Sequence, residues 1–190
     1  SHIVIPSSVR SIGSSSFLGC TAMAAVEIPD SVDTMGSDVF KGCSLLEKLV
    51  LPPNTKAIEN GAFSDCTLLA EISIPGSVRK IGDTAFNNCV ALKKLKIPSS
   101  VNSIGKECFK GCSLLKDIAV PSSVGSVGTS AFADCKSLTQ VSFYASGITF
   151  GPSVFGGCSA LRQILSPSPV QLKILKLYLG VDSKTEVKKV

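Results

Sequence analysis

The sequence predicts a repeat solenoid of class α/β, mostly β, and three regularities support this prediction. Cysteine recurs at steps of 23 residues, at Cys20, Cys43, Cys66, Cys89, Cys112, Cys135 and Cys158. Phenylalanine recurs three positions before each of these cysteines, from Phe17 to Phe155. Proline holds a third fixed position, from Pro6 to Pro121. Three residue types that share one period indicate a stacked array of repeats and not two independent globular domains.

The first element of each repeat is a short strand that follows the cysteine. Apolar residues occupy the sixth and eighth positions after it, as Leu95 and Ile97 do after Cys89. A spacing of two places both side chains on one face of a strand, which we expect to face the core. The next residue in most repeats is proline, which has no N–H to donate and therefore ends the strand.

A second apolar pair, such as Val101 and Ile104, predicts a second extended stretch. Glycine usually follows this pair, where we expect a bend with positive φ: Gly13, Gly36, Gly82, Gly105, Gly128 and Gly151. The stretch from phenylalanine to cysteine is too short for a full helix, so we expect one helical or 3₁₀ turn. It closes on residues that tolerate a left-handed backbone: Gly42, Asp65, Asn88, Gly111 and Asp134.

The period is lost near the C-terminus, which divides the chain into two parts. Residues 1–166 form the expected solenoid, of about seven repeats, and the chain opens inside a repeat, so we interpret it as N-terminally truncated. Residues 167–190 are expected to form a capping helix and a tail. Ser168 suits the start of that helix, Pro169 its first position and Gly180 its end. A further, degenerate repeat and a partner-binding or membrane-surface helix are the alternatives.

Composition excludes several classes of protein. Hydrophobic residues make up 44% of the chain and charged residues 17%, which argues against disorder. No apolar run reaches the 18 or more residues that a transmembrane helix needs. The net charge of +5 is spread along the chain, and no aromatic residues are interleaved with the basic ones for base stacking. We therefore expect neither a transmembrane segment nor nucleic-acid binding.

The sequence holds no recognisable catalytic or cofactor-binding set. The only histidine, His2, lies at the start of the chain, so no Cys-His or Ser-His pair is expected. We interpret the eight cysteines as buried free thiols that pack as small hydrophobic residues. A disulfide framework and a zinc site are less favoured, because seven equivalent cysteines cannot all pair and no C-x-x-C motif occurs. The chain is thus expected to be no enzyme and to carry no catalytic, metal or cofactor site.

The best-formed repeat is CVALKKLKIPSSVNSIGKECFKGC, from Cys89 to Cys112. This sequence resembles the leucine-rich repeats of the BspA-like, or Treponema pallidum, type, and the resemblance covers about residues 3–166. It implies a curved leucine-rich repeat array with a parallel sheet on its concave side. It also implies an adhesin or binding module that is secreted or at the cell surface. Because the chain opens inside a repeat, we expect further repeats or domains in the full-length protein. The family has no common catalytic residues to transfer.

The residues between and before the inward-facing strand positions vary from repeat to repeat, so we expect them on the surface. Those we single out as a partner-binding surface are Lys48, Glu71, Lys93, Lys94, Lys96, Lys116, Asp117, Gln140 and Arg162. The lysines favour an acidic protein or a glycan as the partner, although a merely solvated face is also consistent with the sequence.

The functional prediction is a non-catalytic protein-interaction or adhesion module that recognises a protein or glycan partner. The alternative is an intracellular scaffold in a large assembly, for example a cytoskeletal one. Free cysteines favour this cytoplasmic alternative, because secreted proteins usually oxidise theirs.

Overall fold

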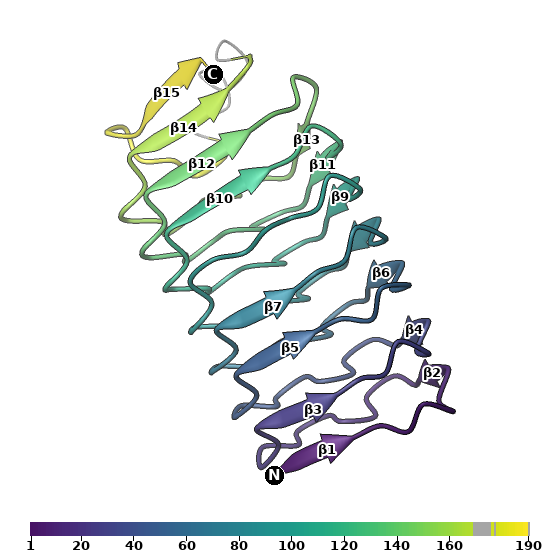
Figure 1. Cartoon of the computed structure of the whole chain (residues 1–190). Helices are drawn as coiled ribbons and strands as arrows, with labels where there is room; N and C mark the ends of the chain where they lie inside the picture. The colour runs from purple at the N-terminus through teal and green to yellow at the C-terminus, as the bar shows by residue number, and fades with distance from the viewer. Residues whose placement is uncertain (169–175, 177, 190) are drawn as a thin grey trace.

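The fold is that of a computed structural model, which describes residues 1–168, 176 and 178–189. The chain winds into a solenoid in which every paired strand is parallel to its neighbour (Figure 1). One side, the long-strand face, carries the strands that follow the cysteines. They are β1 (His2–Val4), β3 (Ala25–Glu27), β5 (Lys48–Val50), β7 (Glu71–Ser73), β10 (Asp117–Val120), β12 (Gln140–Phe143), β14 (Gln163–Ser166) and β15 (Glu186–Lys189).

The opposite side, the short-strand face, carries strands of two residues each. They are β2 (Ser11–Ile12), β4 (Thr34–Met35), β6 (Ala57–Ile58), β8 (Lys80–Ile81), β9 (Ser103–Ile104), β11 (Ser126–Val127) and β13 (Thr149–Phe150). Each residue pairs with the one a full repeat later, as Ile81 pairs with Ile104 and Ile118 with Val141. The predicted 23-residue solenoid with two extended stretches per repeat is therefore confirmed.

The described residues contain no helix, so the predicted α/β class is wrong and the fold is all-β. The segments from phenylalanine to cysteine are hydrogen-bonded turns, not helical or 3₁₀ turns. Their residue before the cysteine is left-handed, as predicted, with φ of 60° at Asp65 and 58° at Asn88. A second left-handed residue lies two positions before the phenylalanine, as at Thr84 (φ 54°). A left-handed residue on each side of the turn prevents a helix from continuing through it.

The core is built from columns of like residues, one member from each repeat. Seven phenylalanine rings stack from Phe17 to Phe155, with neighbouring centroids 5.2 to 5.8 Å apart. The rings from Phe40 onward are buried, whereas Phe17 at the N-terminal end is half-buried. Because each ring packs on the same ring of the next repeat, a large apolar residue is needed at this position in every repeat.

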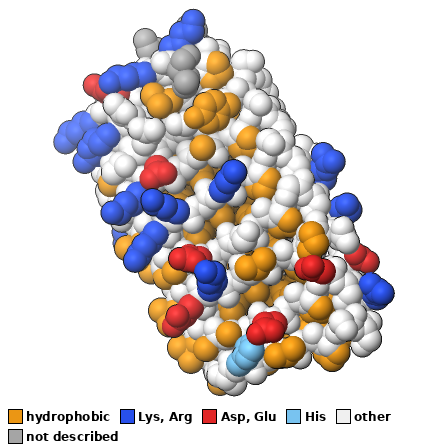
Figure 2. All heavy atoms as spheres, in the orientation of Figure 1, with side chains coloured by type: hydrophobic (Ala, Val, Ile, Leu, Met, Phe, Trp, Pro, Cys, Tyr) orange, Lys and Arg blue, Asp and Glu red, His pale blue; other side chains and the backbone are white. Residues whose placement is uncertain are grey.

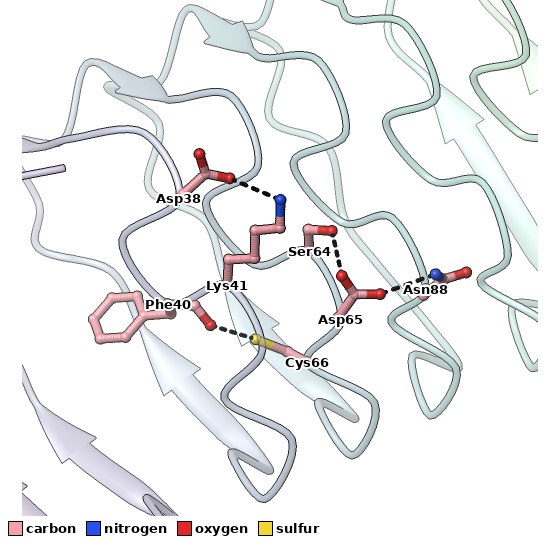
Figure 3. A network of polar contacts seen from close by, with 7 residues as sticks. All are labelled: Asp38, Phe40, Lys41, Ser64, Asp65, Cys66 and Asn88. Atoms are coloured by element: carbon pink, nitrogen blue, oxygen red, sulfur yellow. Dashed lines mark hydrogen bonds and ion pairs between the residues drawn. The ribbon is translucent and has the colours of Figure 1, made fainter. Parts of the chain in front are cut away.

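The segments from phenylalanine to cysteine together form one continuous side, the Phe–Cys edge. Each phenylalanine N–H donates to a carbonyl of the following repeat; for example, the Phe63 N–H donates to the Ala85 carbonyl at 2.8 Å. Cysteine Sγ atoms donate in the other direction, as the Cys66 thiol does to the Phe40 carbonyl at 3.1 Å (Figure 3). The same bond occurs from Cys43 through Cys158. The cysteines are therefore hydrogen-bond donors as well as small apolar residues.

Polar side chains link neighbouring repeats along the outside of this edge. Asn88 donates from Nδ2 to Oδ1 of Asp65 at 2.9 Å, and Ser64 donates from Oγ to Oδ2 of the same carboxylate at 3.1 Å (Figure 3). Within one repeat, Lys41 forms an ion pair with Asp38 at 3.6 Å. Residues in the left-handed position thus connect repeats through their side chains.

The glycines after the short strands do not adopt the positive φ that we expected from the sequence. This holds for Gly13, Gly36, Gly82, Gly105, Gly128 and Gly151. From Gly36 onward, their role is close packing between repeats. A Cβ on Gly128 would lie 2.5 Å from the backbone nitrogen of Lys106 and 2.6 Å from the carbonyl carbon of Gly105. These glycines are therefore needed because the backbone of the preceding repeat lies where a side chain would begin.

The C-terminal segment adds a further layer to the solenoid. Strand β15 pairs with β14, with Gln163 opposite Glu186, and the Phe155 N–H donates to the Leu179 carbonyl at 2.8 Å. The solenoid thus has about eight repeats. Most of the predicted helix from Ser168 to Gly180 lies outside the described residues; Lys176 and Tyr178–Gly180, which are described, lie in turns.

Strand pairing is interrupted on both strand-bearing faces, whereas the contacts along the Phe–Cys edge are continuous. Strand β3 does not pair with β5, and β4 does not pair with β6, so both faces are interrupted between the same two repeats. Glu59 takes the place of the close-packed glycine there, and its N–H lacks the bond that Gly82 and Gly105 donate to the preceding repeat. We attribute this opening to the Glu59 Cβ. A second opening affects only the long-strand face, where residues 93–97 form no strand between β7 and β10.

Candidate functional site

The long-strand face presents the residues that the sequence singled out. Lys48, Glu71, Asp117 and Gln140 are strand residues, and Lys116 and Arg162 immediately precede β10 and β14. Lys93, Lys94 and Lys96 lie in the segment without strand pairing. All are exposed except Gln140, which is half-buried. The prediction that these positions are at the surface is confirmed; their role in binding stays a prediction.

The structure divides these residues into groups and does not form one patch from all of them. Lys48 Nζ pairs with Glu71 Oε2 at 3.0 Å across β5 and β7. Lys93, Lys94, Lys96 and Lys116 form no salt bridge with any described residue. In Figure 2, Lys and Arg side chains gather along one margin of the upper half, while most Asp and Glu side chains lie lower. The unpaired lysines give the middle of this face a local excess of positive charge.

A groove of about 650 Å³ lies where the long-strand face opens, beside Lys93 and Lys94. Its lining residues are Lys48, Leu49, Val50, Ala70, Glu71, Ile72, Ser73, Lys93 and Lys94. Val50 is 61% exposed and Ile72 is half-buried, so aliphatic side chains are accessible between the charged ones. The sequence predicted the charges but not the groove, because it gave no sign that this strand would be unpaired.

Gln140 and Arg162 belong to a different hollow, of about 390 Å³, near the C-terminal end of the face. Thr139, Gln163, Lys184 and Glu186 complete its lining. The Arg162 guanidinium donates from one nitrogen to the Ser159 carbonyl at 3.1 Å and to the Leu161 carbonyl at 3.2 Å. Arg162 is thus held against the backbone of its own repeat. The structure does not bring it together with Lys93, Lys94 and Lys96, which we call the lysine group.

A line of exposed leucines was missed in the sequence. Leu45, Leu68 and Leu114 occupy the position two after the cysteine and are 45%, 43% and 41% exposed. The signal was present, since each precedes a buried leucine, giving Leu45-Leu46, Leu68-Leu69 and Leu114-Leu115. Only the second leucine of each pair serves the core, so the first is available to a partner.

Among the described residues, no group of three or more histidine, cysteine or carboxylate side chains could hold a metal ion. Burial raises the pKa of the Cys66 and Cys112 thiols to about 12 and that of Cys43 to about 11. These thiols therefore stay protonated at neutral pH, and a protonated thiol is not the nucleophilic form.

Over residues 1–168, 176 and 178–189, no helix has the length and hydropathy that a membrane crossing needs.

Comparison with known proteins agrees with the repeat pattern. A family model described as the BspA type leucine rich repeat region matches residues 1–114 and 80–176, with 6 copies of the repeat. The chain belongs to the BspA-type leucine-rich repeat family. Among curated proteins, none matches the sequence.

Solved structures share the fold. A leucine rich cell surface protein from Faecalibacterium prausnitzii is 25% identical with a TM-score of 0.66, over 96% of this chain and 63% of that one. A leucine rich repeat protein from T. pallidum is 25% identical with a TM-score of 0.59, over 97% and 86%. The pneumococcal vaccine antigen PcpA, 18% identical with a TM-score of 0.64 over 100% and 67%, shows the fold alone. The chain thus spans about two thirds of the F. prausnitzii and pneumococcal proteins.

Proposed function

We propose that this chain is a non-catalytic binding module that recognises a protein or glycan partner through the long-strand face. The observation that carries the proposal is the difference between inward-facing and outward-facing positions within each repeat. Inward positions repeat and build the core, whereas outward positions of the long strands differ from repeat to repeat. A rigid scaffold that presents non-repeating side chains is the usual arrangement of a solenoid binding surface.

The comparisons support a location for this function without naming the partner. The F. prausnitzii relative is described as a cell surface protein, and the family is one of repeat proteins that are typically non-catalytic. We infer from this that the present chain acts at the cell surface or after secretion, as part of a larger protein. The partner itself is inferred only from the chemistry of the face.

A second candidate is an intracellular scaffold. The observation that favours it is the state of the cysteines, since all eight are unpaired and seven are buried. Free thiols persist in reducing compartments and are usually oxidised outside the cell. Here burial shields the thiols from oxidants, so the observation favours the scaffold only weakly.

The test is selection of a random-peptide display library on the immobilised chain. We expect the selected peptides to lose binding to the variant with Lys94→Glu and Lys96→Glu. Binding should weaken with added salt, because exposed charges are screened. The matched control is Lys80→Glu in β8, another exposed lysine without a salt bridge to a described residue, but on the short-strand face.

Two results would count against the proposal. If the selected peptides bind both variants equally, the lysine group is not part of the recognition surface. If Lys80→Glu alone abolishes binding, the short-strand face is the interface. Circular dichroism melting of each variant shows whether the fold is intact.

A further inference from the structure

The opening of the long-strand face at residues 93–97 is local to that face. On the short-strand face the same repeats are joined by β8 and β9, with Ile81 opposite Ile104. On the Phe–Cys edge the Phe86 and Phe109 rings stack at 5.3 Å, and the Asn88 N–H donates to the Lys110 carbonyl at 2.8 Å. The repeats are therefore held together on two sides while their third side is separated.

The separation leaves backbone groups without partners. No N–H or carbonyl of Lys93–Ile97 forms a hydrogen bond with another described residue. Corresponding groups in β12 are paired on both sides, with β10 and β14. Backbone polar groups are strong hydrogen-bonding groups, so a ligand that lies along this segment finds donors and acceptors that are free of the sheet.

The apolar floor of the groove follows from the same opening. The sixth position after each cysteine is buried in β5, β10, β12 and β14, at 3% exposure or less. At the opening, Ile72 is half-buried and Leu95 is 9% exposed. Val50, an outward-facing residue of β5 that is 61% exposed, lines the same groove as Ile72. Ile72 is thus more accessible than the residues at the same position in β5, β10, β12 and β14.

The charges of the groove select the sign of the ligand. Lys48 is neutralised by Glu71 at 3.0 Å, whereas Lys93 and Lys94 have no acidic partner among the described residues. Lys96, also without such a partner, extends the positive charge along the same segment. The groove is therefore complementary to an anion.

We propose that this groove binds an extended acidic peptide segment in which carboxylates alternate with aliphatic side chains. The carboxylates pair with Lys93, Lys94 and Lys96, the aliphatic side chains cover Ile72 and Val50, and the peptide backbone bonds to the unpaired segment. Alternation is required because successive side chains of an extended peptide point to opposite sides. No aromatic ring lines the groove, so the stacking surface that often receives sugar rings is absent from it.

This inference rests on the proposed function and specifies its ligand, so the experiment uses a defined probe. The probe is a fluorescent synthetic peptide in which glutamate and isoleucine alternate. One control peptide has serine in place of isoleucine, and another has lysine in place of glutamate. Affinity is measured by fluorescence anisotropy, and the contact residues are identified from amide chemical shifts of the ¹⁵N-labelled chain.

We expect the Glu–Ile peptide to bind and to shift the amide signals of Lys93–Ile97. Affinity should fall about tenfold or more in the variant with Lys93→Glu and Lys94→Glu, because repulsion replaces attraction at two charges. Lys80→Glu should leave it unchanged. The serine peptide should bind about tenfold more weakly, and the lysine peptide should not bind.

The inference is overturned if the serine peptide or heparin binds as tightly as the Glu–Ile peptide, since the groove then attracts any polyanion. It is also overturned if shifts appear only around Gln140 and Arg162. If library peptides still map to the long-strand face, the proposed function survives that failure. If neither probe nor library peptides depend on this face, both proposals fail.

Discussion

The Phe–Cys edge and the long-strand face run along the same repeats but differ in continuity. On the edge, ring stacking, backbone bonds and cysteine bonds continue through every repeat from Phe17 to Phe155. On the face, the sheet divides into three separate paired groups. Repeated residues of fixed identity thus give an unbroken structure, and variable residues give a face with openings. The edge supplies stability, and the face can therefore vary.

The largest expected effect is on the edge. Phe109 is fully buried, and its ring stacks on Phe86 at 5.3 Å and on Phe132 at 5.2 Å. We expect Phe109→Ala to lower the free energy of unfolding by about 3–5 kcal/mol, since it removes a large buried side chain. Phe17→Ala is the matched control, because Phe17 is half-buried and stacks on one ring only. Equal losses in urea unfolding would show that the stack does not act as a continuous column.

The second prediction concerns the close approach of neighbouring repeats. Gly128→Ala should lower the free energy of unfolding by about 1–3 kcal/mol, because the new Cβ meets the backbone at Lys106 and Gly105. Gly76→Ala is the control, since no heavy atom lies within 4 Å of its Cβ position. We expect that variant to be unchanged or slightly more stable. A tolerated Gly128→Ala would mean that the repeats can separate there as they do at Glu59.

The third prediction is a loss of stability at alkaline pH. Burial raises the pKa of the Cys112 thiol from 9.0 to about 12, so the folded state keeps a proton that the unfolded state loses. The stabilisation is complete below pH 9 and is lost as the pH rises from 9 towards 12. The slope is about 1.4 kcal/mol per pH unit for each such thiol. Urea midpoints measured from pH 8 upward should fall, and less steeply in Cys112→Ala. A flat profile would contradict burial of the thiols.

The repeat length, the two extended stretches and the core columns were predictable because identical residues must stack at one period. The absence of a helix in the described residues was not, because it depends on left-handed residues such as Thr84 and Glu107. Thr and Glu carry no sequence preference for that conformation. The role of glycines such as Gly128 was also misjudged, because a short approach between repeats and a positive φ both select glycine.

The candidate site shows a similar limit. That Lys93, Lys94 and Lys96 are at the surface follows from alternation along the strand. Residues 93–97, which include them, match the repeat pattern well, yet this segment does not pair with the neighbouring strands. Lysine is depleted in strands, which weakens pairing here, but that preference depends on neighbours that only the structure reveals. The groove was therefore beyond sequence reasoning, whereas its charge was not.

The smallest expected effect separates the paired and open parts of the face. Lys48 and Glu71 form an exposed ion pair across β5 and β7, whereas Glu71 and Lys94, one repeat apart in the same column, form none. Double-mutant cycles with alanine should give a coupling of about 0.2–1 kcal/mol for the first pair and none for the second. Because both cycles include Glu71→Ala, the effects of losing the other contacts of Glu71 are the same in each cycle. Equal couplings would mean that the sheet closes over residues 93–97 in solution, and the groove would then lose the unpaired backbone on which its peptide ligand depends.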